Sequence, residues 1–250
     1  MLKLNDYDFE FDELFEDALD TIEIRLEDMS DPCADIEDKE DAAWILTGKY
    51  QELAYAHYVL EEFDKVKPYL EKAAPFAYLS GFDPELKLNN NEWTIQNELT
   101  ITLLFGSVTT KQKLQAVGWS LPAENIMHQA CYLYDHLLIK IGTGQVLSQS
   151  EIQTALTEAK KTKDKDVQQY IAPLIEAINA LTTGEQTQWQ ASIDKVIAWH
   201  KDECKFGDYK EDEKGIMSLN ALTMAKLGKD MHGWACTTDS LYLPLYLINE

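Results

Sequence analysis

Apolar residues recur at every third or fourth position along most of the chain, which is the spacing of one face of an α-helix. In the first such segment, residues 11–29, the apolar positions form one stripe and carboxylates cover the remaining surface. The stripe consists of Phe11, Leu14, Phe15, Ala18, Ile22, Leu26 and Met29. The pattern predicts a packed amphipathic helix with an acidic outer face.

The same periodicity predicts nine further helices, whose ends are marked by capping residues and glycines. Ser148 and Glu151 supply amino-terminal capping chemistry, and Gly81, Gly142 and Gly228 each follow a predicted carboxyl-terminal end. The expected helices are residues 36–62, 64–80, 93–105, 109–117, 122–141, 148–161, 164–181, 185–205 and about 213–227.

These elements predict an all-α protein, a single compact multi-helix array without a significant sheet. Segment 93–105 is rich in β-branched residues, but its apolar positions fit helical spacing and no second strand-like run exists to pair with it. We expect one domain over residues 1–250, with a weak internal boundary in the asparagine-rich loop 82–91. Segment 50–81 resembles a tetratricopeptide-type helical hairpin, although its pattern does not repeat along the chain.

Negative charge is concentrated at the start of the chain. The first 41 residues hold 17 Asp or Glu against three basic residues, and so carry 14 of the 22 net negative charges. A local excess of this kind attracts cationic partners and speeds their encounter, and it disfavours nucleic acid and anionic membranes as ligands. The alternative is a solvated face that only keeps the protein soluble.

The acidic face of the first helix is therefore the predicted partner-binding surface, with nearby aromatic residues as anchors. The residues are Asp12, Glu13, Glu16, Asp17, Asp20, Glu23, Trp44 and Tyr50.

Neither the length of the apolar runs nor the start of the chain indicates a membrane protein or a secretion signal. No run approaches the roughly 18 to 20 apolar residues of a spanning helix, and the first residues are acidic. Four scattered cysteines do not form a disulfide framework. We expect a cytoplasmic protein with reduced thiols.

Two His-Cys pairs are the most catalytic-looking pattern. His200 and Cys204 are four residues apart, as are His232 and Cys236, and the two pairs together could complete a tetrahedral zinc site. Gly233 interrupts the second pair, so two unrelated pairs are the favoured interpretation. Phosphate-binding glycine loops, nucleophile elbows and His-Glu-x-x-His motifs are absent from the sequence. We expect no catalytic residue, no metal and no cofactor, and thus a binding protein rather than an enzyme.

The final third has a distinctive order of features: a helix ending in His-Lys, a glycine before a Leu/Ala-rich helix, and a closing Ser-x-Tyr-Leu-Pro. The matching residues are His200, Lys201, Gly215, Ser240, Tyr242, Leu243 and Pro244. This order resembles the carboxyl-terminal half of the immunity protein 49 family of bacterial polymorphic toxin systems. The resemblance implies a non-enzymatic protein that binds and blocks one cognate toxin domain, and it implies that these motif residues hold the fold.

A concentrated acidic surface suits a cationic toxin, such as a nuclease or another nucleic-acid-directed toxin, in contact-dependent or secretion-system competition. A helical adaptor or regulator that binds a peptide is the alternative function. The pattern leaves the oligomeric state open.

Overall fold

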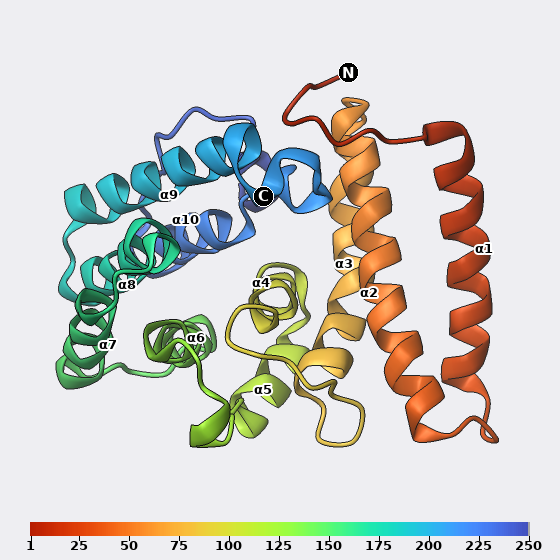
Figure 1. Cartoon of the computed structure of the whole chain (residues 1–250), viewed down its shortest axis with the longest axis horizontal. Helices are drawn as coiled ribbons and strands as arrows, with labels where there is room; N and C mark the ends of the chain where they lie inside the picture. The colour runs from red at the N-terminus through yellow and green to blue at the C-terminus, as the bar shows by residue number, and fades with distance from the viewer. Residues whose placement is uncertain (250) are drawn as a thin grey trace.

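The computed structural model describes residues 1–249, and this part of the chain contains ten α-helices and no strand. The first helix, α1 (Phe11–Ser30), lies at one edge and packs mainly on α2 (Ile36–Val59) (Figure 1). The predicted stripe makes this contact, because Ala18 and Ile22 are buried. Leu26 is the exception: α1 has one main neighbour, so the flank of the stripe is uncovered and Leu26 is 39% exposed.

The second and third helices form a hairpin. Small side chains let α2 approach α3 (Phe63–Phe82) closely, and Ala54, Ala73 and Ala77 are all fully buried between their neighbours. The predicted stop at Gly81 is wrong, because this glycine lies inside α3. A Cβ atom there would come within 2.9 Å of Glu98 Cβ, so Gly81 permits the close approach of α4. The tetratricopeptide character of the hairpin stays a prediction.

The middle of the chain begins with α4 (Ile95–Phe105), which confirms that the β-branched segment is helical. All but one of its residues are buried, which explains why the segment is apolar around most of its circumference. Next come α5 (Val108–Val117) and α6 (Gln129–Gly142). The helix expected over 122–141 starts later than predicted, because the exposed residues after Pro122 form only the short 3-10 turn η1 (Ala123–Asn125).

The following helices agree well with the sequence pattern. α7 (Gln149–Lys161) begins with the expected capping box, in which the Ser148 hydroxyl and the Glu151 carboxylate each accept a hydrogen bond from the other's backbone N–H. A π-helical segment, η2 (Val167–Ile171), leads directly into α8 (Ala172–Thr183), and α9 (Gln186–Phe206) follows.

The last long helix, α10 (Leu219–His232), is displaced from the predicted range 213–227. Short 3-10 turns η3 (Asp208–Glu211) and η4 (Glu213–Gly215) occupy the preceding segment, and η5 (Leu245–Ile248) lies near the end of the chain. Gly228 lies inside α10 rather than ending it. A Cβ there would come within 2.3 Å of the buried Trp189 ring, so packing requires the glycine. Gly233, with φ of +69°, is the actual end.

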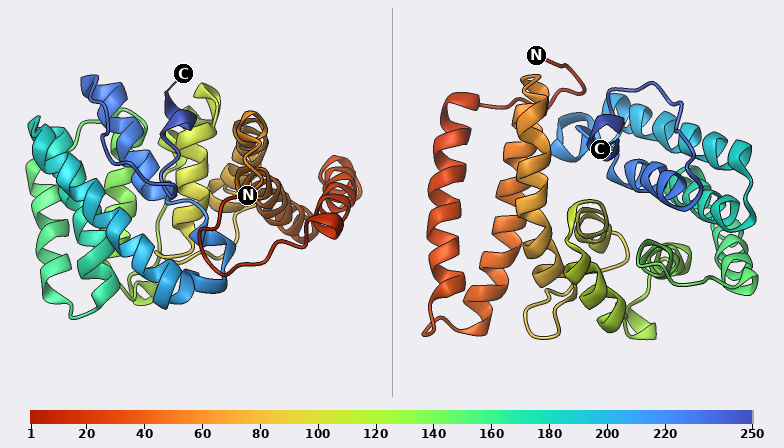
Figure 2. Two further views of the ribbon diagram at one scale, coloured as in Figure 1. Left: turned by 90° about the horizontal axis from the view of Figure 1, so that it is seen from above. Right: turned by 180° about the vertical axis from the view of Figure 1, so that it is seen from behind.

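One hydrophobic cluster extends from Leu4 to Ile248 and includes residues on both sides of loop 82–91. The helices before and after this loop, α3 and α4, lie side by side (Figure 2). This continuity supports the proposal of a single domain. No helix in residues 1–249 combines the length and the apolar character that crossing a membrane requires.

Candidate functional site

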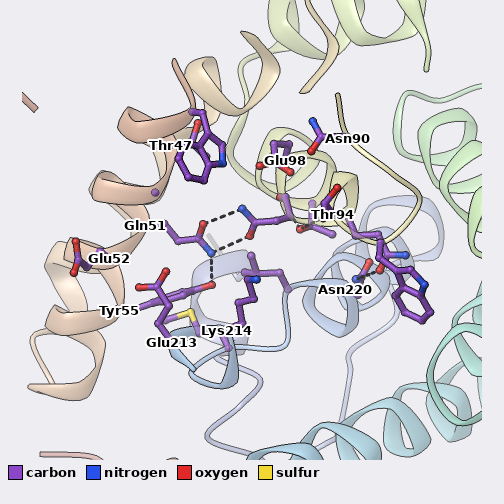
Figure 3. A pocket seen from close by; sticks show the side chains of 18 of the residues that line it. Thr47, Gln51, Glu52, Tyr55, Asn90, Thr94, Glu98, Glu213, Lys214 and Asn220 are labelled. Atoms are coloured by element: carbon purple, nitrogen blue, oxygen red, sulfur yellow. Dashed lines mark hydrogen bonds between the residues drawn. The ribbon is translucent and has the colours of Figure 1, made fainter. Parts of the chain in front are cut away.

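A cleft of about 930 Å³ opens near the middle of the molecule. One wall is α2, another is the loop over residues 88–94 together with α4, and a third is the segment that runs from η4 into α10 (Figure 3). We call this hollow the central cleft. Its size lies in the upper part of the range typical of ligand-binding pockets.

Amide side chains bridge two walls of the central cleft. Gln51 on α2 and Asn97 on α4 exchange two hydrogen bonds, at 3.0 and 3.1 Å (Figure 3). The Gln51 amide nitrogen also donates to the Tyr55 hydroxyl at 2.6 Å. Deeper in the cleft, the Asn220 amide donates to Tyr170 and Gln96 and accepts from a buried tyrosine hydroxyl. These groups satisfy one another, which indicates a structural role for them.

Glu98 on α4 differs from these amides. Its side chain lines the central cleft but is only 5% exposed, and its Oε2 atom accepts no hydrogen bond within residues 1–249. Burial raises the pKa of this carboxyl to about 7, and hydrogen bonding from its own backbone N–H and from the Asn97 side chain, with the Lys214 ammonium, acts in the opposite direction. The Ser218 hydroxyl also lines the cleft and is buried without a partner in the described chain. The cleft thus holds two buried polar atoms, Glu98 Oε2 and Ser218 Oγ, that have no hydrogen-bond partner in residues 1–249.

More carboxylates lie at the edge of the central cleft. Burial raises the pKa of Glu213 to about 7, and the nearby negative charges of Glu52 and Asp212 contribute further. The Lys49 ammonium binds Glu52 and also Asp17 of α1, at 2.9 Å in each case. Through Lys49, the acidic face of α1 is therefore continuous with the edge of the cleft.

The six predicted acidic interface residues all lie on α1, and all are exposed. At 100° per residue they fall on the side of the helix away from Ala18 and Ile22, so they form one surface rather than a scattered set. We call this surface, made of Asp12, Glu13, Glu16, Asp17, Asp20 and Glu23, the acidic face.

The two predicted aromatic anchors lie elsewhere. Trp44 is 55% exposed, and it lines the central cleft instead of joining the acidic face. Tyr50 is only 8% exposed and stacks on Phe76 of α3, with ring centroids 6.0 Å apart. In this conformation Tyr50 packs the hairpin and offers little surface to a partner.

The family-motif residues meet beneath the central cleft. His200 Nε2 and Cys204 Sγ both contact the Gly215 carbonyl oxygen, at 3.1 and 3.2 Å. Burial lowers the pKa of His200 to about 4 and raises that of Cys204 to about 12, so both side chains are uncharged near neutral pH. Gly215 does not start the apolar helix as predicted; it lies in η4 and supplies the carbonyl that joins α9 to the segment before α10.

The end of the chain closes on this cluster. The Tyr242 hydroxyl donates to the Leu4 carbonyl, and the Tyr242 carbonyl accepts from the Ser218 amide at 2.8 Å. Leu243 and Pro244 are buried beside them, whereas Ser240 is half-buried and Lys201 is exposed. This geometry supports the structural role proposed for the motif. It gives no structural role to Lys201, whose side chain is exposed.

Replacing Gly215 by alanine should destabilise the protein by roughly 1 to 3 kcal/mol. The added Cβ would lie 2.5 Å from Asn5 Nδ2 and 2.6 Å from the Tyr209 carbonyl oxygen, in a site without free space. Urea unfolding measures the change. Gly48→Ala is the control, because nothing lies within 4 Å of a Cβ there. A Gly215→Ala variant as stable as Gly48→Ala would contradict this account of the motif.

The two His-Cys pairs do not meet. His232 contacts the Leu181 carbonyl oxygen at 2.7 Å, and Cys236 lies near Gln190 and Thr238. Within residues 1–249 no group of three or more histidine, cysteine or carboxylate side chains is arranged to hold a metal ion.

The model of the family described as Immunity protein 49 matches residues 125–247, about half of the chain. Over this stretch the chain is similar to the immunity protein 49 family. The match contains all the motif residues, from His200 to Pro244, and the η4–α10 wall of the central cleft. The acidic face and the α2 wall lie outside it. No curated protein and no solved structure matches the chain. The family suggests an immunity protein directed against a toxin.

Sequence reasoning missed Glu98, Glu213 and Gly48, which lie on three walls of the central cleft. Glu98 and Glu213 are two of 44 acidic residues, and spacing does not distinguish them from the others. Gly48 carried a usable signal, since a glycine in the interior of a helical pattern needs a packing or functional reason.

Proposed function

We propose that this protein binds and neutralises a cognate antibacterial toxin domain without catalysing a reaction. The match of residues 125–247 to the immunity protein 49 family carries the proposal. A protein of this kind must recognise one partner tightly, and a surface with a strong local charge favours fast, specific association.

We further propose that the acidic face is the first contact surface and that the toxin is cationic, as a nuclease or another nucleic-acid-directed toxin would be. Six exposed carboxylates share one side of α1, and within α1 only Arg25 is basic. Proteins that bind phosphate backbones carry basic surfaces, which a carboxylate-rich helix complements. We therefore propose that the protein binds a cationic toxin, that it does not bind nucleic acid, and that it acts in the cytoplasm.

Co-expression tests this function directly. A toxin domain encoded beside the gene of this protein should arrest growth when expressed alone in a sensitive bacterium, and growth should resume when this protein is produced with it. The purified pair should elute as one complex in size-exclusion chromatography. Continued growth arrest in cells that contain the folded protein, together with separate elution, would refute the proposal.

The alternative, a peptide-binding adaptor, gains support from one observation: the central cleft is large enough for a segment of polypeptide. The rescue experiment separates the two functions. An adaptor would leave the toxin active, whereas an immunity protein would not.

A further inference from the structure

Glu98 is the starting point, because burying its carboxylate lowers the stability of the fold and no contact within the described chain explains why an acidic residue is needed there. A buried carboxylate needs a hydrogen-bonding or cationic partner, yet its Oε2 atom has none within residues 1–249. The neighbouring amides of the cleft form hydrogen bonds with one another. The fold can therefore satisfy buried polar groups in this part of the molecule. A group left in this state is typical of a site completed by a ligand.

The charges of the cleft indicate the sign of that ligand. The charged side chains of the lining are the carboxylates of Glu52, Glu98 and Glu213 and the ammonium groups of Lys49 and Lys214. Lys49 is already engaged by Asp17 and Glu52. The lining therefore has an excess of acceptor oxygens, and a cationic hydrogen-bond donor would complement it.

Gly48 indicates that something approaches the α2 wall. Glycine within a helix is less favourable than alanine, because it loses more backbone freedom on folding. At Gly48 no packing reason exists, because a Cβ would meet nothing within 4 Å. The missing side chain instead leaves room in the cleft one turn after Trp44, whose ring lines the same wall and is more than half exposed.

We propose that the central cleft is a docking site for an arginine or lysine side chain carried on an extended segment of a cationic partner protein, with the carboxylates of Glu98 and Glu213 as its acceptors. The Trp44 ring supplies a π-face beside the cation, and the Ser218 hydroxyl supplies a further acceptor. A polypeptide segment is favoured because about 930 Å³ exceeds what one side chain fills. The identity of the partner in this inference rests on the proposed function. The existence of a cation-binding site in the cleft does not depend on that function.

A short fluorescent peptide with two arginines flanked by glycines is the first probe, and the same peptide with citrulline in place of arginine is its neutral counterpart. Fluorescence anisotropy should show the arginine peptide binding at least about tenfold more tightly, the effect of one charge-assisted contact. Equal binding of the two peptides, or no binding of either, would overturn the proposal.

Two cleft variants remove the site by different means. Glu98→Gln keeps the shape and removes the charge, and Gly48→Leu keeps every charge and fills the space. Each should weaken peptide binding by about tenfold. Glu124→Gln, which removes an exposed carboxylate outside the cleft, is the control and should change little. Thermal unfolding should show both cleft variants folded. If both bind the peptide as the wild type does, the proposal fails.

Two further comparisons identify the occupant. Lysine substitutions on the acidic face should weaken peptide binding only at low salt, whereas the losses in the cleft variants should persist at high salt because buried contacts are screened less. Spermidine binding more tightly than the arginine peptide would assign the cleft to a small polycation and overturn the proposal. If peptide binding behaves as expected but toxin rescue fails, the cleft assignment stands and the immunity proposal does not. The reverse result rejects the cleft alone.

Discussion

Replacing Asp12, Glu16, Asp20 and Glu23 by lysine should slow association with the toxin by roughly one to two orders of magnitude at low salt. The four substitutions reverse the field of the acidic face, and electrostatic steering accounts for rate differences of this size between complementary and neutral surfaces. Asp17 is left unchanged because it binds Lys49. Stopped-flow mixing at several salt concentrations measures the rate, which in the variant should no longer fall as the salt concentration rises.

The matched control reverses four exposed acidic residues outside α1, namely Glu124, Asp202, Asp208 and Asp239. It changes the net charge equally but leaves the acidic face intact, so association should slow much less. If both variants slow association by the same factor, net charge alone steers the encounter and the acidic face is not the contact surface. Circular dichroism checks that α1 remains helical.

Replacing Glu98 by glutamine should raise the free energy of unfolding at pH 8 by up to about 3 kcal/mol. The pKa of this carboxyl is about 7 in the folded protein, against an ordinary value of 4.5 for a solvated glutamate. Below pH 4.5 the group is protonated in both states and costs nothing. Between pH 4.5 and 7 the folded state retains a proton that the unfolded state releases, so stability falls as pH rises, and the full penalty persists above pH 7. Glutamine cannot ionise and avoids this loss.

Urea unfolding of the wild type and the variant at pH 5 and at pH 8 measures the difference. The two proteins should have similar stabilities at pH 5 and diverge at pH 8, while the exposed-site control Glu124→Gln should follow the wild type throughout. Identical pH dependence of the wild type and Glu98→Gln would show that the carboxyl is not buried as described. Higher stability combined with weaker peptide binding would identify Glu98 as a residue kept for binding.

The helices were predictable because their signals are local. The stripe of α1 and the capping box of α7 are contained within single segments, and both are confirmed. The ends at Gly81 and Gly228 were misjudged for a physical reason. Each glycine serves a contact with a distant residue, Glu98 or Trp189, and periodicity within one helix does not contain that information.

The candidate site also has one part that could be predicted from the sequence and one part that could not. The acidic face was predictable because charge density is a property of the sequence itself. The central cleft was not, because its walls come from segments more than 100 residues apart, such as Gly48 on α2 and Ser218 before α10. Trp44 was selected from the sequence, but only the fold shows that it belongs to the cleft and that Tyr50 is buried.

The bond from Tyr242 to the Leu4 carbonyl has a consequence for the moment at which the protein becomes functional. Since Leu4 and Tyr242 are 238 positions apart, synthesis must proceed through residue 242 before this hydrogen bond can form. A nascent chain would carry an exposed α1 long before its cleft had a third wall. The acidic face and the closed cleft would then be present together only after this late segment has been synthesised.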